Sequence, residues 1–181
     1  LDIQMLLPLH GHVWRQDLGY ILGKYDLWSR YEPEQRGVVI AYASVYGGTE
    51  NAANILACRL REQGVQVEMF DTSVTPASYI LAAAFRFSHV VLAAPTYNGG
   101  VFVTMENLLH DLTAHGLKGR RAAYIENGSW APTSARGMQK LLEPLNWETA
   151  ADTVTLRSAL RQGQQEDLER MAMQLAESVK A

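Results

Sequence analysis

Short apolar runs alternate with amphipathic helical patterns from Val38 to the end of the chain. The runs have the length of strands, and the segments between them repeat apolar residues three or four positions apart. The predicted strands are 38–43, 65–71, 89–94, 121–125 and 149–156. The predicted helices begin at Thr49 and at Thr75–Pro76, and span 101–114, 134–145 and 165–179. This alternation predicts an α/β fold, a doubly wound five-stranded parallel sheet with strand order 2-1-3-4-5.

The first 36 residues do not follow this alternation. Residues 13–31 predict an amphipathic helix whose apolar face is rich in aromatic side chains. The polar segment 32–37 has Pro33 near its start and Gly37 at its end, as linkers often do. We therefore expect two parts, residues 1–36 and residues 37–181.

The turn after the first predicted strand has the composition of an anion site. It contains Ser44, Val45, Tyr46, Gly47, Gly48 and Thr49. The first N–H groups of a helix lack internal partners, glycines let the backbone close on a phosphate, and hydroxyls add donors. The sequence matches neither G-x-G-x-x-G nor the lysine-containing P-loop, so we expect a single terminal phosphate held by hydrogen bonds. The alternative at this point is an ordinary helix start with Thr49 as its N-cap.

The ends of the third and fourth predicted strands should reach the same edge of the sheet. The residues there are Pro95, Thr96, Tyr97, Asn98, Gly99 and Gly100, and then Asn127, Gly128, Ser129 and Trp130. Each loop has glycine for close backbone approach, amide and hydroxyl groups, and one aromatic side chain for stacking on a flat ring. Asn-Gly pairs are also common turn residues, so ordinary turns are the alternative here.

Composition excludes several classes of function. A formal net charge of −3 and a pI near 6.0 give no electrostatic footprint for nucleic acid. The longest apolar runs are far shorter than a membrane span. A single cysteine, Cys58, excludes an internal disulfide and a thiolate metal cluster, and indicates a cytoplasmic protein. The chain starts without Met, so we expect it to be part of a longer protein.

The three loops resemble the FMN-binding loops of flavodoxins, and residues 38–181 resemble the flavodoxin-like domain of the flavodiiron proteins. The segment Pro8-Leu9-His10-Gly11, followed by Trp14-Arg15, is similar to the end of the β-lactamase-like domain that precedes it in that family. The resemblance implies that the three loops bind FMN. It also implies that His10 is a di-iron ligand, although only in an intact parent protein, because the other ligands of the family lie upstream of Leu1.

The resemblance implies an electron-transfer domain of an oxidoreductase whose intact form reduces O2 or NO. It further implies a rubredoxin-like or flavin reductase electron donor and a homodimer. We expect the fragment itself to carry no di-iron centre and no catalytic residue. Two alternatives remain: a flavin-dependent NAD(P)H or quinone reductase, and a cofactor-free interaction module that docks through the aromatic helix at 13–31.

Overall fold

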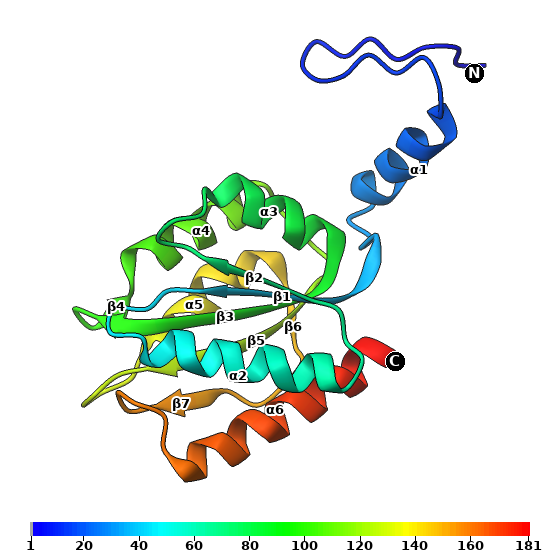
Figure 1. The fold of residues 1–181 in the computed structure, drawn as a ribbon. Helices are drawn as coiled ribbons and strands as arrows, with labels where there is room; N and C mark the ends of the chain where they lie inside the picture. Colours follow the sequence, from blue (N-terminus) through cyan, green and yellow to red (C-terminus); the bar gives the residue numbers. More distant parts are fainter. Residues whose placement is uncertain (1) are drawn as a thin grey trace.

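The computed structural model describes residues 2–181, and its centre is a sheet with the strand order β2-β1-β3-β5-β6 (Figure 1). All neighbours along this path pair in parallel. The predicted parallel sheet and its strand order are confirmed, with β5 corresponding to the fourth predicted strand and β6 to the start of the fifth. The strands are β1 (Gln35–Tyr42), β2 (Val67–Asp71), β3 (Phe87–Tyr97), β4 (Gly100–Val101), β5 (Arg121–Asn127), β6 (Glu148–Thr149) and β7 (Val154–Leu156).

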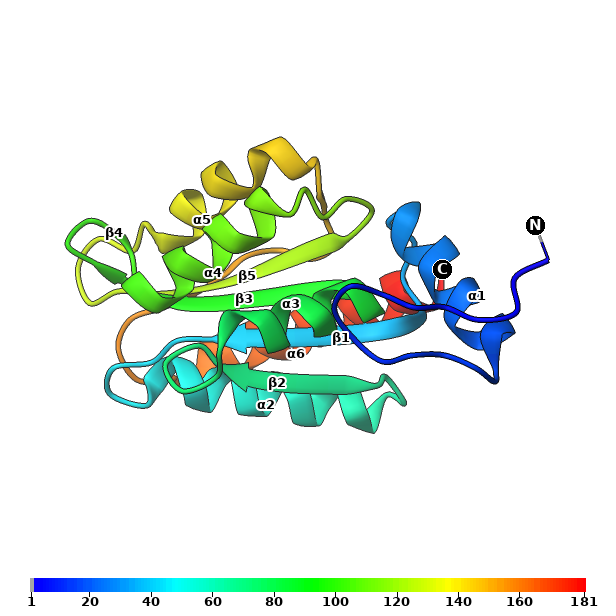
Figure 2. The ribbon, with the colours of Figure 1, turned by 90° about the horizontal axis from the view of Figure 1, so that it is seen from above.

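Helices cover both faces of the sheet, as Figures 1 and 2 show. Two of them, α2 and α6, pack on one face, and α3, α4 and α5 pack on the other. The apolar side chains of the central strands are fully buried between these layers. The helices are α1 (Leu18–Ser29), α2 (Gly48–Glu62), α3 (Ala77–Arg86), α4 (Val103–Ala114), α5 (Ser134–Leu142) and α6 (Gln162–Lys180), with a 3₁₀ turn at Glu143–Leu145.

The fifth strand is divided, where the sequence predicted one continuous strand over 149–156. Its first piece, β6, pairs with the start of β5, and its second piece, β7, pairs with the end of β5. Between the two pieces, the Ala150 N–H still donates to the Ala122 carbonyl (2.7 Å), and residues 151–153 then leave the ladder. Ala151 turns into the core there, and Asp152 bonds to Gln174 of α6 through its N–H (3.0 Å) and its carboxylate (2.9 Å). Packing against α6 therefore replaces ladder pairing at this edge.

Two predicted helix starts were wrong because local backbone structure preceded them. Pro76 is the N-cap of α3, so Thr75 does not cap the helix and Pro76 is not its first residue. Val101 belongs to β4 rather than to α4. Asn98 (φ 49°) and Gly99 (φ 75°) form a two-residue turn that pairs Thr96 with Val101.

Helix α1 is shorter than the predicted 13–31 and none of its residues is buried. Trp14 lies outside it, in a β-bridge with Leu6. The segment before β1 projects from the end of the sheet opposite the loops that follow β1, β3 and β5 (Figures 1 and 2). Within residues 2–181, none of the helices combines the length and apolar character that crossing a bilayer requires.

Candidate functional site

The three loops singled out in the sequence meet around one cavity of about 430 Å³ at the carboxyl ends of β1, β3 and β5. Its lining residues are Ser44, Val45, Tyr46, Gly48, Thr49, Pro95, Thr96, Tyr97, Asn127, Gly128, Ser129, Ser158 and Ala159. Of the predicted residues, Gly47, Asn98, Gly99, Gly100 and Trp130 lie in the same loops but are not among the lining residues. No lysine, arginine, histidine or carboxylate in the described part of the chain lines the cavity.

The first loop ends in an open helix N-terminus. Gly47 is the N-cap of α2 and has φ 80°, a conformation that favours glycine. Thr49 lies one residue inside the helix and is 2% exposed, so the alternative of Thr49 as N-cap was wrong. Among the described residues, no side chain caps α2. The first N–H groups of the helix therefore face the cavity with the positive end of the helix dipole.

Ser44 supplies a second donor without a partner. Its Oγ is buried and makes no hydrogen bond with any residue in 2–181. A buried hydroxyl without a partner carries a desolvation cost, so an anionic or carbonyl oxygen in the cavity would stabilise it. An open helix terminus and an unsatisfied hydroxyl at one end of a cavity fit a phosphate group.

The second loop is held against α5 by side-chain hydrogen bonds. Thr96 Oγ1 accepts the backbone N–H groups of Thr133 (2.9 Å) and Ser134 (3.1 Å), so it caps the start of α5. Thr133 Oγ1 donates to the Gly99 carbonyl at 3.1 Å, and Ser134 Oγ donates to the Ala94 carbonyl at 2.8 Å. These bonds connect the second loop to the start of α5, so the turn at Asn98–Gly99 is anchored.

Aromatic side chains stand around the mouth of the cavity. Tyr46 is 98% exposed, Trp130 is 92% exposed and Tyr97 is 48% exposed. Tyr97 packs edge-on against Phe102, with ring centroids 5.6 Å apart. Exposed aromatic rings beside a cavity are available to stack on a flat ligand. The arrangement therefore provides phosphate donors at one end and aromatic surface at the rim.

A fourth loop, which follows β7 and was not predicted from the sequence, also reaches the cavity. Glu126, at the end of β5, accepts the Ala135 N–H (3.1 Å) and the Thr155 hydroxyl (2.8 Å), which fixes β5 to α5 and β7. Ser158 and Ala159, which follow β7, also line the cavity. The signal in the sequence was position alone, because the end of the fifth strand reaches the same edge of the sheet as the others.

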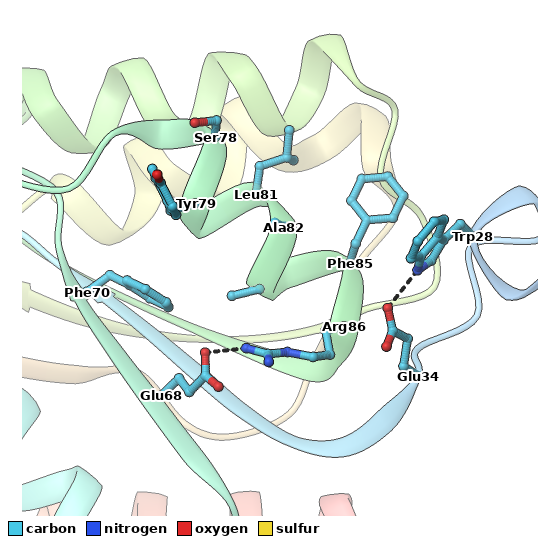
Figure 3. Close-up of a pocket in the computed structure, with 11 residues that line it drawn as sticks. Trp28, Glu34, Glu68, Phe70, Ser78, Tyr79, Leu81, Ala82, Phe85 and Arg86 are labelled. Carbon is cyan, nitrogen blue, oxygen red and sulfur yellow. Dashed lines mark hydrogen bonds and ion pairs between the residues drawn. The ribbon is translucent and has the colours of Figure 1, made fainter. Parts of the chain in front are cut away.

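A second, larger hollow of about 700 Å³ lies over α3 and the edge strand β2 (Figure 3). Its lining is mainly apolar, with Phe70, Leu81 and Phe85 among its residues. The charged groups at its border already have partners, because Arg86 pairs with Glu68 and Trp28 Nε1 donates to Glu34 at 2.7 Å (Figure 3). None of the described residues that line this groove has a buried polar side-chain atom without a partner, as Ser44 has in the first cavity, so the groove is the weaker candidate.

The predicted metal ligand lies far from the cavity. His10 is exposed in the turn between Leu6 and Trp14, in the segment before α1. Among residues 2–181, no three His, Cys, Asp or Glu side chains gather as metal ligands would. His89, by contrast, is buried at the opposite end of β3 from the cavity and bonds to two serine hydroxyls.

Comparison with known proteins adds to this geometry. No family model matches the chain. It is 29% identical over 143 residues to a nitric oxide reductase of Moorella thermoacetica, a match that covers 79% of this chain and 35% of that protein. Rubredoxin oxygen:oxidoreductase from Desulfovibrio gigas superposes with a TM-score of 0.90 at 22% identity, over 98% of this chain and 44% of that one. The flavodiiron protein from Giardia intestinalis gives a TM-score of 0.87 at 21% identity with the same coverage.

The chain is related to the flavodiiron proteins. Its fold is also that of the flavodoxins: the Streptococcus pneumoniae flavodoxin superposes with a TM-score of 0.67 at 23% identity, over 78% of this chain and 98% of that one. The chain spans less than half the length of the curated flavodiiron relatives that it matches. Its similarity to them thus concerns one part of a longer architecture.

Proposed function

We propose that this chain is the FMN-binding, electron-transferring part of a flavodiiron-type oxidoreductase. The observation that carries the proposal is the start of α2: among residues 2–181, no side chain caps its N–H groups, the buried Ser44 Oγ beside them has no partner, and no charged side chain lines the cavity. This donor set suits one terminal phosphate. The relatives favour this function over the reductase and interaction-module alternatives.

In this proposal each loop binds a different part of FMN. Ser44 and the α2 terminus hold the phosphate, while Tyr97 and Trp130 stack on the ring and the anchored backbone of the second loop meets its polar edge. FMN supplies the one- and two-electron chemistry when bound. The protein orients the ring, limits water access and supplies the hydrogen-bond donors and acceptors around it.

The activity of a longer protein is a further part of the proposal. We infer that such a protein reduces O2 or NO, as the names of the relatives suggest for them. Its electron donor would be rubredoxin-like or a flavin reductase, it would act as a cytoplasmic homodimer, and His10 would ligate a di-iron centre together with residues outside this chain. Residues 1–36 would then be the end of the di-iron domain and a linker.

The test is the absorbance spectrum of the purified chain, followed by chromatography of the cofactor released on denaturation. We expect FMN equimolar with the chain, or stoichiometric uptake of added FMN with quenching of tryptophan fluorescence. Release of FAD would contradict the single-phosphate assignment. A colourless chain that binds no added FMN would overturn the function and leave the fold in place.

Gly48→Ala tests the cavity itself. A Cβ at Gly48 would lie 2.5 Å from the Ser158 carbonyl oxygen, so the loops must shift. Such overpacking costs about 1–3 kcal/mol, so we expect the Kd for FMN to rise by about 10- to 100-fold in a fluorescence titration. Gly163→Ala is the matched control, because a Cβ there meets no atom of the described chain within 4 Å. Equal Kd values for the two variants would argue against this cavity as the binding site.

A further inference from the structure

The loop between β7 and α6 lines the cavity beside the start of α2. We name residues 157–160 the strap (Figure 1, the orange loop between β7 and α6). The two leucines at its borders are anchored, since Leu156 is fully buried and Leu160 packs against the core. Between them, Arg157, Ser158 and Ala159 are exposed. Hydrogen bonds rather than apolar burial therefore hold the middle of the strap.

One side chain makes most of these bonds. Asn127 Oδ1 accepts the Ser158 N–H at 2.9 Å, and Asn127 Nδ2 donates to the Ser158 carbonyl at 2.9 Å. The same Nδ2 lies 3.3 Å from Thr49 Oγ1 in the first turn of α2. Ser129 and Ser158 add a bond between their hydroxyls at 3.0 Å. Asn127 is 8% exposed, so its amide links the strap to the start of α2 from inside the protein.

The backbone of the strap is strained where Asn127 holds it. Ser158 has φ 69°, a left-handed conformation that a residue with a Cβ rarely adopts without compensation. Its carbonyl oxygen also presses on the start of α2, where only the missing Cβ of Gly48 leaves room. A strained segment that a few hydrogen bonds keep closed opens when those bonds are lost.

We propose that Asn127 is a positioning residue that latches the strap over the phosphate end of the cavity, and that opening of the strap limits release of the bound flavin. The part that concerns flavin rests on the proposed function, whereas the latch itself does not. The amide of Asn127 acts through the strap backbone. The two strap residues that line the cavity, Ser158 and Ala159, carry no charge, so retention would depend on the position of the strap backbone.

Arg157 provides a direct readout of strap opening. Trypsin cuts after arginine only in chain that can extend away from the fold, so its rate follows the open population. We would follow cleavage after Arg157 by mass spectrometry in the chain without flavin. In Asn127→Ala, loss of two bonds to the strap should speed this cut by about 10- to 100-fold.

Two further variants make the result specific. Ser158→Val weakens the same latch from the exposed side, because a β-branched residue is strained at φ 69° and valine has no hydroxyl to bond with Ser129, while the peptide bond after Arg157 stays cleavable by trypsin. It should therefore speed the cut as Asn127→Ala does. Asn54→Ala is the matched control, since it removes one amide bond to the Glu50 carbonyl (3.0 Å) on the surface of α2, away from the strap. Its cleavage rate should stay near that of the unmodified chain.

Flavin release is then measured by dilution of the loaded chain and recovery of free FMN fluorescence. Faster cleavage and faster release in both latch variants support the proposal. Unchanged cleavage overturns the latch, and faster cleavage with unchanged release overturns the role of the strap in retention. If the unmodified chain takes up no FMN, the proposed function fails, and the latch is still decided by the cleavage rates.

Discussion

At the scale of single residues, His89 shows how burial and positive neighbours hold an imidazole neutral. It is 3% exposed and lies between the hydroxyls of Ser88 (2.8 Å from Nδ1) and Ser178 (2.9 Å from Nε2). Burial, reinforced by Arg121 and Arg36, lowers the pKa of His89 from 6.5 to about 4. Neutral imidazole can bond to both hydroxyls, so His89 connects β3 to α6 without a charge.

This shift predicts a loss of stability in mild acid. The unfolded chain takes up a proton near pH 6.5, whereas the folded protein does so only near pH 4. The unfolded state therefore binds more protons in this window, and stability falls as the pH drops through it. The loss should reach about 3 kcal/mol at most by pH 4. His89→Gln keeps a donor and an acceptor but cannot titrate, so its free energy of unfolding in urea should depend less on pH. If the two proteins showed the same dependence on pH, the lowered pKa of His89 would be contradicted.

At the scale of elements, Arg120 connects the end of α3 to the segment before β1 through backbone carbonyls. Its guanidinium donates to Ala84 (2.7 Å) and Phe85 (2.6 Å) near the end of α3, and to Tyr31 (2.5 Å) before β1. The end of a helix is negative, so these carbonyls suit a cation. Burial lowers the pKa of Arg120 to about 10, which leaves it charged at neutral pH. The link thus fixes the linker to the body of the domain.

Arg120→Lys should therefore destabilise the domain and loosen the linker. A lysine ammonium cannot reach the carbonyls at the end of α3 and the Tyr31 carbonyl at once, and each buried carbonyl without a partner costs about 1–3 kcal/mol. We expect a loss of about 2–4 kcal/mol in urea unfolding, and faster hydrogen exchange over residues 18–31. Arg121→Lys, at the exposed neighbouring position, is the control and should change stability by less than about 1 kcal/mol. Similar losses in both variants would refute the proposed role of Arg120.

At the scale of the whole molecule, the sequence determined the strands and their order because alternation of apolar strands and amphipathic helices is a strong local pattern. The three loops were found because they follow strands that end at one edge of the sheet. The strap was missed because its conformation depends on a distant partner: nothing in Arg157–Leu160 indicates that Asn127 will hold Ser158 in a left-handed conformation. The division of the fifth strand likewise depends on Gln174 of α6.

The segment before β1 differs from the rest in the apolar surface that it exposes. Leu7 is 69% exposed, Leu9 is 97% exposed and Tyr25 is 67% exposed. Glu34 holds α1 through Lys24 and Trp28. Burial opposes ionisation of this carboxyl, but the two hydrogen bonds outweigh it and lower the pKa of Glu34. A few polar contacts with Glu34 therefore hold α1 on the rest of the domain.

Removal of residues 1–29 should consequently leave the remaining domain folded. The shortened chain keeps Tyr31 and its bond to Arg120. It loses α1, an exposed helix whose polar contacts with Glu34 are partly screened by water. We expect its free energy of unfolding to stay within about 2 kcal/mol of the full value, with cooperative unfolding in urea. Light scattering should show less self-association, because the exposed apolar surface is gone. Loss of cooperative unfolding would instead place this segment inside the folding unit and contradict the domain boundary near residue 36.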